Sequence, residues 1–339
     1  MYHIPKRILG SLCKQKKIKF RGEPLDKLIN ELEKAGLTDT LQYFDKEFRF
    51  AEGTKALTMC KPERIFPNSS ANAEKFIEKL IQEKKILREQ VGTFWEPEYT
   101  SEIKLCGIIQ DGADVFIRMV EEKYTNRKRG WKSAREPYAY VTSAVIHFSE
   151  QLVELRCSYY VRHHYLEFIM DLLGFPNKMQ KEEWAWLTSV TKEEAKRISE
   201  LLSAKLSSSH IAIPSTVGSM RLEGIKDVDL REDKTFNEIL NLINSQLKLS
   251  TDDTLDETCT LKFTDPVGQV DFDVVFEINI LSGGFKFVSG LVSEKVIDQI
   301  LDAFIIVYVE RNKKKKAQGY VDTTQERITA GEQILEGSV

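Results

Sequence analysis

The sequence predicts an α+β protein built around a duplicated antiparallel strand–turn–strand–helix module. Two stretches carry this prediction, residues 138–172 and residues 270–304. In both, apolar residues recur first with a period of about two and then with the period of a helix. A constant shift of 132 residues, from Tyr138 to Val270, superposes them without a gap. A chance likeness between two units of similar length is the alternative, because residue identity is low.

A duplicated module has consequences for shape. Two copies side by side predict a curved sheet with helices on one face and the other face open to a partner. Asp271 and Asp273 of the second copy stand where the first has Ala139 and Val141. This asymmetry disfavours a sheet face that binds phosphates along its whole length and points instead to the loops or to a protein partner.

Composition narrows the class of protein. The 339 residues allow two domains, or three if one is small. A net charge of −3 means that nucleic-acid binding requires a local basic patch. Five dispersed cysteines indicate a reducing compartment. The start of the chain lacks a signal-peptide run, and the apolar run Ala303–Val309 is too short to cross a bilayer. We expect a cytoplasmic protein without a membrane partner.

Residues 1–66 are expected to form a small, mostly helical domain. The helical spacing of its leucines predicts a helix over 23–35, and a shorter helix is expected over 6–13. Strands over 41–44 and 47–50 complete a winged-helix-like fold. A helical cap on the following domain is the alternative.

Three further parts follow a Pro- and Asn-containing linker. Residues 73–190 form the first α+β module and residues 191–310 the second. The second begins with a helix over 191–206, where Thr191 and Glu194 have the spacing of a capping box. Residues 311–339 are expected to form a polar, flexible tail.

Two basic segments are the candidate nucleic-acid contacts. Cations for phosphates, with aromatic faces for bases, are what such binding requires. The candidates are Lys16, Lys17, Lys19 and Arg21 in one segment, and Arg127, Lys128, Arg129, Trp131, Lys132 and Arg135 in the other. The alternative for the second segment is a solvated hairpin loop whose charges keep a sheet edge soluble.

A third pattern consists of a Gly-Ser pair, an Asp-x-Asp pair, a helix and a later strand with further acids. Its residues are Gly218, Ser219, Asp227, Asp229, Asp271 and Asp273. The pattern resembles the metal site of the nucleotidyltransferase superfamily, over about 60 residues.

The resemblance implies an enzyme in which the carboxylates of Asp227, Asp229 and Asp271 hold two Mg²⁺ ions. Alternate residues of a strand face the same way, so Asp227 and Asp229 are expected to share a face. The backbone near Gly218 and Ser219 would contact the phosphates of a nucleoside triphosphate. The sequence departs from the family pattern in the short spacing between Ser219 and Asp227.

We therefore expect a non-catalytic binding or assembly protein that needs no cofactor. Its partner is DNA or RNA, or else another protein, including a second copy of the chain. The first alternative is the nucleotidyltransferase-like enzyme, with Mg²⁺ and a nucleoside triphosphate. The second is a structural subunit of a protein complex.

Overall fold

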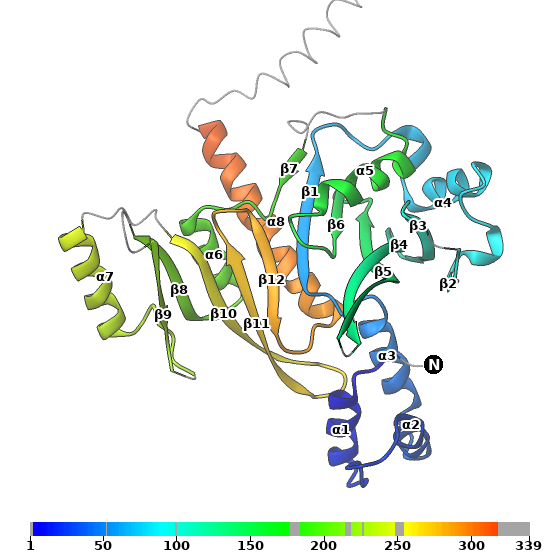
Figure 1. Ribbon diagram of the computed structural model, residues 1–339, viewed down its shortest axis with the longest axis horizontal. Helices are drawn as coiled ribbons and strands as arrows, with labels where there is room; N and C mark the ends of the chain where they lie inside the picture. The colour runs from blue at the N-terminus through cyan, green and yellow to red at the C-terminus, as the bar shows by residue number, and fades with distance from the viewer. Residues whose placement is uncertain are drawn as a thin grey trace, which may run out of the picture.

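A computed structural model describes residues 3–51, 53–98, 100–129, 131–176, 184–213, 218–225, 227–247 and 254–317 (Figure 1). These residues form a mixed α+β structure around one open, antiparallel, twelve-stranded sheet, which confirms the predicted class. None of the helices in these ranges combines the length and the apolar character needed to span a bilayer.

The strands are β1 (Ala56–Pro62), β2 (Thr93–Phe94), β3 (Lys104–Asp111), β4 (Asp114–Arg129), β5 (Lys132–His147), β6 (Leu152–Leu155), β7 (Trp184–Trp186), β8 (Lys205–Ile213), β9 (Gly218–Glu223), β10 (Thr254–Thr264), β11 (Asp271–Asn279) and β12 (Gly284–Ser289). The helices are α1 (Lys6–Gln15), α2 (Leu25–Lys34), α3 (Thr38–Arg49), α4 (Ala73–Gln82), α5 (Arg162–Leu173), α6 (Lys192–Leu201), α7 (Lys234–Leu247) and α8 (Glu294–Ala317), with 3-10 turns at Asn68–Ser70 and Arg88–Gln90. The strand order is β2-β3-β4-β5-β6-β1-β12-β11-β10-β8-β9, and β7 pairs with β1.

The strand β1 joins the two halves of the sheet. Its first residues pair with β12, where Leu57 lies opposite Phe285, and the next residues pair with β6. Leu57 and Met59 belong to one hydrophobic core and Cys60 to another. Successive residues of a strand point to opposite faces, so this one strand contributes to both cores.

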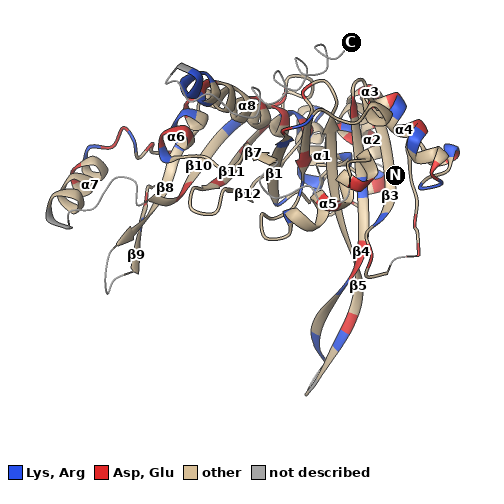
Figure 2. Ribbon diagram, turned by 90° about the horizontal axis from the view of Figure 1, so that it is seen from above, with Lys and Arg blue, Asp and Glu red and all other residues tan. Residues whose placement is uncertain are grey.

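The two cores lie on opposite sides of the sheet. The first, which we call the α8 core, packs α1–α3, α6 and α8 on β8 and β10–β12. The second, the α5 core, packs α4 and α5 on β3–β6. Figure 2 shows α6 and α8 along one side of the sheet and α5 on the other. Each half therefore has helices on one face, as expected, but the covered face of one half is opposite to the covered face of the other.

The strand–turn–strand–helix order recurs with the predicted offset. β6 and β12 begin at Leu152 and Gly284, and α5 and α8 begin at Arg162 and Glu294, a shift of 132 residues in both cases. Both β6 and β12 run antiparallel to β1 and flank it, so the second unit has its faces reversed relative to the first. The origin of the two units in a duplication stays a prediction.

The expected winged-helix strands were wrong. Residues 38–49 form the helix α3 instead, because Leu41, Phe44 and Phe48 make a buried helical stripe. This stripe packs into the α8 core. β1 lies within the predicted N-terminal domain, yet it is a central strand of the sheet.

Two helix boundaries also differ from expectation. α6 ends at Leu201, because Ser203 adopts a left-handed φ of 51° and the chain then enters β8. α8 continues to Ala317, so residues 311–317 of the predicted tail are helical. Three lysines in its last turn favour that ending by their interaction with the helix dipole. The remainder of the predicted tail, 318–339, lies outside the described residues.

Candidate nucleic-acid interface

β4 and β5 form a hairpin that continues well beyond the body of the sheet. They pair from Asp114–His147 at the base to Arg129–Lys132 at the tip. The neighbouring strand β3 pairs with β4 only as far as Val120. On the other side, β6 pairs with β5 only from Ala144 onward. We call the outer part, residues 121–143, the arm. At about 3.3 Å per residue it projects by about 30 Å, as Figure 2 shows.

The arm has two faces of different character. Directly opposed residues of an antiparallel pair point to the same face. One face, here the cationic face, carries Tyr124, Asn126, Lys128, Ser133 and Arg135. The opposite face carries Lys123, Thr125, Arg127, Ala134 and Glu136.

The cationic face presents its polar groups to solvent. The guanidinium of Arg135 lies 4.4 Å from the ring centre of Tyr124, whose hydroxyl donates to Glu122 at 2.5 Å. Asn126, Lys128 and Arg135 are exposed. No carboxylate of the described residues forms an ion pair with Lys128 or Arg135. This face therefore keeps both cations available to an anionic partner.

The opposite face anchors the arm to the body. Arg127 pairs with Glu136 at 3.8 Å, and Lys123 pairs with Glu121 at 2.8 Å. Glu121 also accepts hydrogen bonds from Tyr165 and His164 of α5. Burial favours the neutral form of Glu121, but these donors outweigh it and lower the pKa of its carboxyl group. Lys123 and Arg127, the cations of this face whose side chains the structure describes, thus have carboxylate partners within the protein.

A pocket of about 660 Å³ lies at the base of the arm. Its lining includes Lys55, Arg118, Tyr140, Ser143 and Ser158. Arg118 and Ser143 are cross-strand partners on the same side of the ladder as the cationic face. The guanidinium of Arg118 donates to the Arg49 carbonyl at 2.6 Å and lies 4.2 Å from the ring centre of Phe94. Arg118 therefore continues this side of the ladder into the body, and Lys55 lines the same pocket.

The structure separates the two predicted basic segments. Arg127, Lys128 and Arg135 lie on the arm, and Trp131 is fully exposed at its tip. Arg129 and Lys132 close the ladder, but their side chains lie outside the described set. Lys16, Lys17, Lys19 and Arg21 are exposed between α1 and α2. Figure 2 shows α1 and α2 in the body, away from the tip of the arm.

The predicted nucleotidyltransferase-like carboxylates do not converge. Asp227 and Asp229 lie in a turn after β9 rather than on a strand, so the expectation that they share a strand face was wrong. Asp227 has a left-handed φ of 69° and pairs with Lys262 at 2.9 Å. The carboxylate of Asp229 accepts the backbone N–H groups of Leu206 and Arg231, each at 3.1 Å, and so holds the turn.

The remaining residues of that pattern also have local roles. Gly218 and Ser219 open β9, the last strand of the sheet. Asp271 accepts a hydrogen bond from Thr264 at 2.6 Å, and Asp273 lies opposite Lys262 in the β10–β11 ladder. Among the described residues, the three-ligand group whose atoms are close enough to share an ion consists of Asp114, His147 and Glu150.

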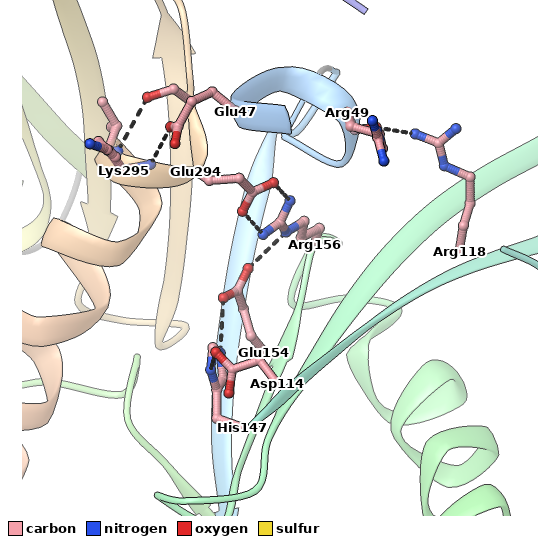
Figure 3. A network of polar contacts seen from close by, with 11 residues as sticks. Glu47, Arg49, Asp114, Arg118, His147, Glu154, Arg156, Glu294 and Lys295 are labelled. Atoms are coloured by element: carbon pink, nitrogen blue, oxygen red, sulfur yellow. Dashed lines mark hydrogen bonds and ion pairs between the residues drawn. The ribbon is translucent and has the colours of Figure 1, made fainter. Parts of the chain in front are cut away.

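A buried ionic network is the feature that the sequence did not reveal (Figure 3). Arg156 donates to Glu154 at 2.8 Å and to both oxygens of Glu294, at 2.7 and 2.5 Å. Glu154 also lies 3.4 Å from Nε2 of His147, whose Nδ1 is 3.1 Å from Asp114. These residues are up to 180 positions apart, so only the fold brings them together.

Burial and charge act against each other in this network. Burial lowers the pKa of His147, but hydrogen bonds to Asp114 and Glu154 outweigh it and raise this pKa to about 10. Burial raises the pKa of Glu294 despite the attraction of Arg156. For Glu154 the balance is reversed, since Arg156 and His147 together lower its pKa.

No protein-family model matches this sequence, and no curated protein matches it significantly.

Proposed function

We propose that this protein binds double-stranded DNA and that the arm lies in the major groove. The observation that carries the proposal is the cationic face on a ribbon that projects by about 30 Å. A tight turn after Val120 would be enough to join β4 to β5. The sheet therefore does not need the extension. Within the extension, residues 123–135 contain six cationic residues and no carboxylate.

The dimensions and side chains of the arm fit a groove. The major groove of B-DNA, about 12 Å wide, admits a two-stranded ribbon. Asn and Arg are the side chains that form paired hydrogen bonds with adenine and guanine there, and Asn126 lies directly opposite Arg135. Lys128, nearer the tip, is placed for a phosphate contact. The major groove of A-form RNA is too narrow and deep for such a ribbon, so we favour DNA.

Protection of a sheet edge is the simpler explanation for a charged hairpin. It requires charges on the edge, but it requires neither an extension nor a difference between the faces. Here Lys123 and Arg127 of one face are paired with glutamates, while Lys128 and Arg135 of the other have no such partner among the described residues. A protein partner, or a second copy of the chain, would instead pair with the backbone edges of the arm.

A shortened arm tests the proposal. Thr125 and Glu136 are cross-strand partners, so deletion of 126–135 and insertion of Asn-Gly between them preserves the register and gives a favoured two-residue turn. We expect this variant to fold as the full chain does and to lose binding to a mixed-sequence DNA duplex, measured by fluorescence anisotropy. Equal binding by the shortened variant, or no binding by the full chain, would overturn the proposal.

Charge variants separate groove binding from general attraction. Each lost phosphate contact reduces the slope of log K against log salt by about 0.9. We expect Lys128→Gln with Arg135→Gln to reduce this slope by about 0.9 between 50 and 200 mM salt, for the phosphate contact of Lys128, and to weaken binding further through the lost base contact of Arg135. The matched control, Lys34→Gln with Lys196→Gln, removes two exposed charges of the body and should leave the slope unchanged. If the full chain binds an RNA duplex as tightly as DNA, the groove assignment fails.

A further inference from the structure

We propose that Asp114, His147 and Glu150 bind a divalent transition-metal ion at the base of the β4–β5 ladder. Asp114 opens β4 and His147 closes β5, and they are cross-strand partners. Glu150 follows in the turn that leads to β6. One ligand atom from each residue lies within 4.8 Å of the other two. The site is at the opposite end of the ladder from the tip of the arm and is independent of the proposed DNA contact.

The donor atoms and their spacing fit a metal such as Zn²⁺. Imidazole nitrogen with carboxylate oxygens is a ligand set that Zn²⁺ accepts, at bond lengths of about 2.0–2.2 Å. Two ligand atoms of a tetrahedral site are then about 3.3 Å apart. Nδ1 of His147 and Oδ2 of Asp114 are 3.1 Å apart, so an ion fits between them with little adjustment. Glu150 is exposed and can rotate to complete the set.

The surroundings orient the histidine for ligation. A metal-bound histidine usually donates its other ring N–H to a carboxylate. Nε2 of His147 is 3.4 Å from Oε2 of Glu154, and these side chains are only 8% and 1% exposed. Arg156 fixes Glu154 in turn, as Figure 3 shows. This arrangement directs Nδ1 toward Asp114 and Glu150, and a bound ion takes the place of the Nδ1 proton.

The competing explanation is a charged histidine held between Asp114 and Glu154. It accounts for those two carboxylates but not for Glu150, which adds a third negative charge near one imidazolium. No cation of the described residues pairs with Glu150. A divalent ion balances Asp114 and Glu150 together. Because Glu150 and part of Asp114 reach solvent, the fourth ligand position is open to water or to a substrate.

Calorimetric titration of Zn²⁺ into the chelator-treated full chain tests this site. We expect one ion per chain, and a loss of affinity of about 10- to 100-fold in Glu150→Gln. Glu150 is exposed, so the ion-free variant should melt at the temperature of the wild type. Glu102→Gln, an exposed glutamate in another loop, is the matched control and should bind as the wild type does.

A second variant distinguishes the proposed site from Zn²⁺ binding at another place on the protein. His147→Gln should abolish the site, and the melting temperature of the wild type alone should rise with added Zn²⁺. Equal Zn²⁺ affinity in wild type, Glu150→Gln and His147→Gln would overturn the proposal, as would a wild type that binds no Zn²⁺. Neither result bears on DNA binding by the arm, which the shortened variant tests separately.

Discussion

Arg156, just after β6, and Glu294, the first residue of α8, form a two-pronged ion pair between positions 138 residues apart. Their side chains are 2% and 12% exposed. The pair fastens the half of the sheet that carries the arm to the helix that covers the other half. It also fixes Glu154, which in turn orients His147.

Removal of the arginine should be costly. Arg156→Met leaves Glu154 and Glu294 buried without their shared cation, and breaking a buried pair in this way costs about 3–5 kcal/mol. Urea unfolding should show this loss as a lower midpoint. The control Lys34→Met breaks the exposed pair with Glu31 and should change stability by less than about 1 kcal/mol. Similar small losses in both variants would mean that the network contributes little.

Glu47 should make stability depend on pH. Burial raises the pKa of its carboxyl above the usual value of 4.5, although the backbone N–H of Lys295 donates to it at 3.0 Å. The folded state therefore holds this proton more tightly than the unfolded chain. The corresponding stability is complete below pH 4.5 and is lost as pH rises through the raised pKa. Glu47→Gln keeps an acceptor for Lys295 without the charge. The free energy of unfolding of the variant, compared with that of the wild type, should therefore be higher at pH 8 than at pH 4. If the free energy of unfolding changed with pH in the same way for the wild type and for Glu47→Gln, this prediction would be wrong.

Gly290, between β12 and α8, should not tolerate a side chain. A Cβ there would lie 2.4 Å from the Asp273 carbonyl oxygen and 3.0 Å from Cα of Val274, and φ is +111°. Both contacts are backbone of β11, which cannot move without disturbing the sheet. The control Gly112 has a φ of +62° and open space around it. Gly112→Ala should therefore lose only the free energy of unfolding that the strained left-handed backbone costs, about 1–2 kcal/mol. We expect Gly290→Ala to lose about 1–3 kcal/mol more in denaturant unfolding. Equal losses would mean that β11 adjusts freely.

Trp131 should affect binding without affecting stability. Its side chain is fully exposed at the tip of the arm, so Trp131→Ala should change the free energy of unfolding by less than about 0.5 kcal/mol. Its ring offers apolar contact, for example with a thymine methyl group in the groove, and no charge. We expect weaker DNA binding with an unchanged salt slope, in contrast to the charge variants. A changed salt slope in Trp131→Ala would indicate that the arm itself had been displaced.

Local sequence patterns predicted much of the fold. Thr191 and Glu194 form the expected capping box, with hydrogen bonds of 3.3 and 2.9 Å between them. The error at 41–50 arose because aromatic residues there favour strands, whereas packing into the α8 core requires a helix. The acids at Asp227 and Asp229 alternate as strand residues do, but the carboxylate of Asp229 holds a turn and that of Asp227 pairs with Lys262.

The candidate sites were predicted only in part. The sequence locates the basic residues of the arm, but it offered a solvated hairpin loop for that segment and did not reveal that paired strands continue through it. β4 instead extends to Arg129 and is held there by β5 alone. Asp114 and His147 become neighbours only through the register of a ladder whose length the sequence did not reveal.

The shared strand β1 also sets an order of events during synthesis. The cross-strand partner of Leu57 is Phe285, 228 residues later in the chain, so the face of β1 that bears Leu57 cannot be covered until Phe285 has been synthesised. At about 5–20 residues per second the ribosome needs about 10–45 s to supply that partner. The α5 core draws on residues no later than Trp186 and can close first. The apolar side chains of α1–α3 stay without α8 until that helix has been synthesised, so we expect chaperones to bind the nascent chain until then.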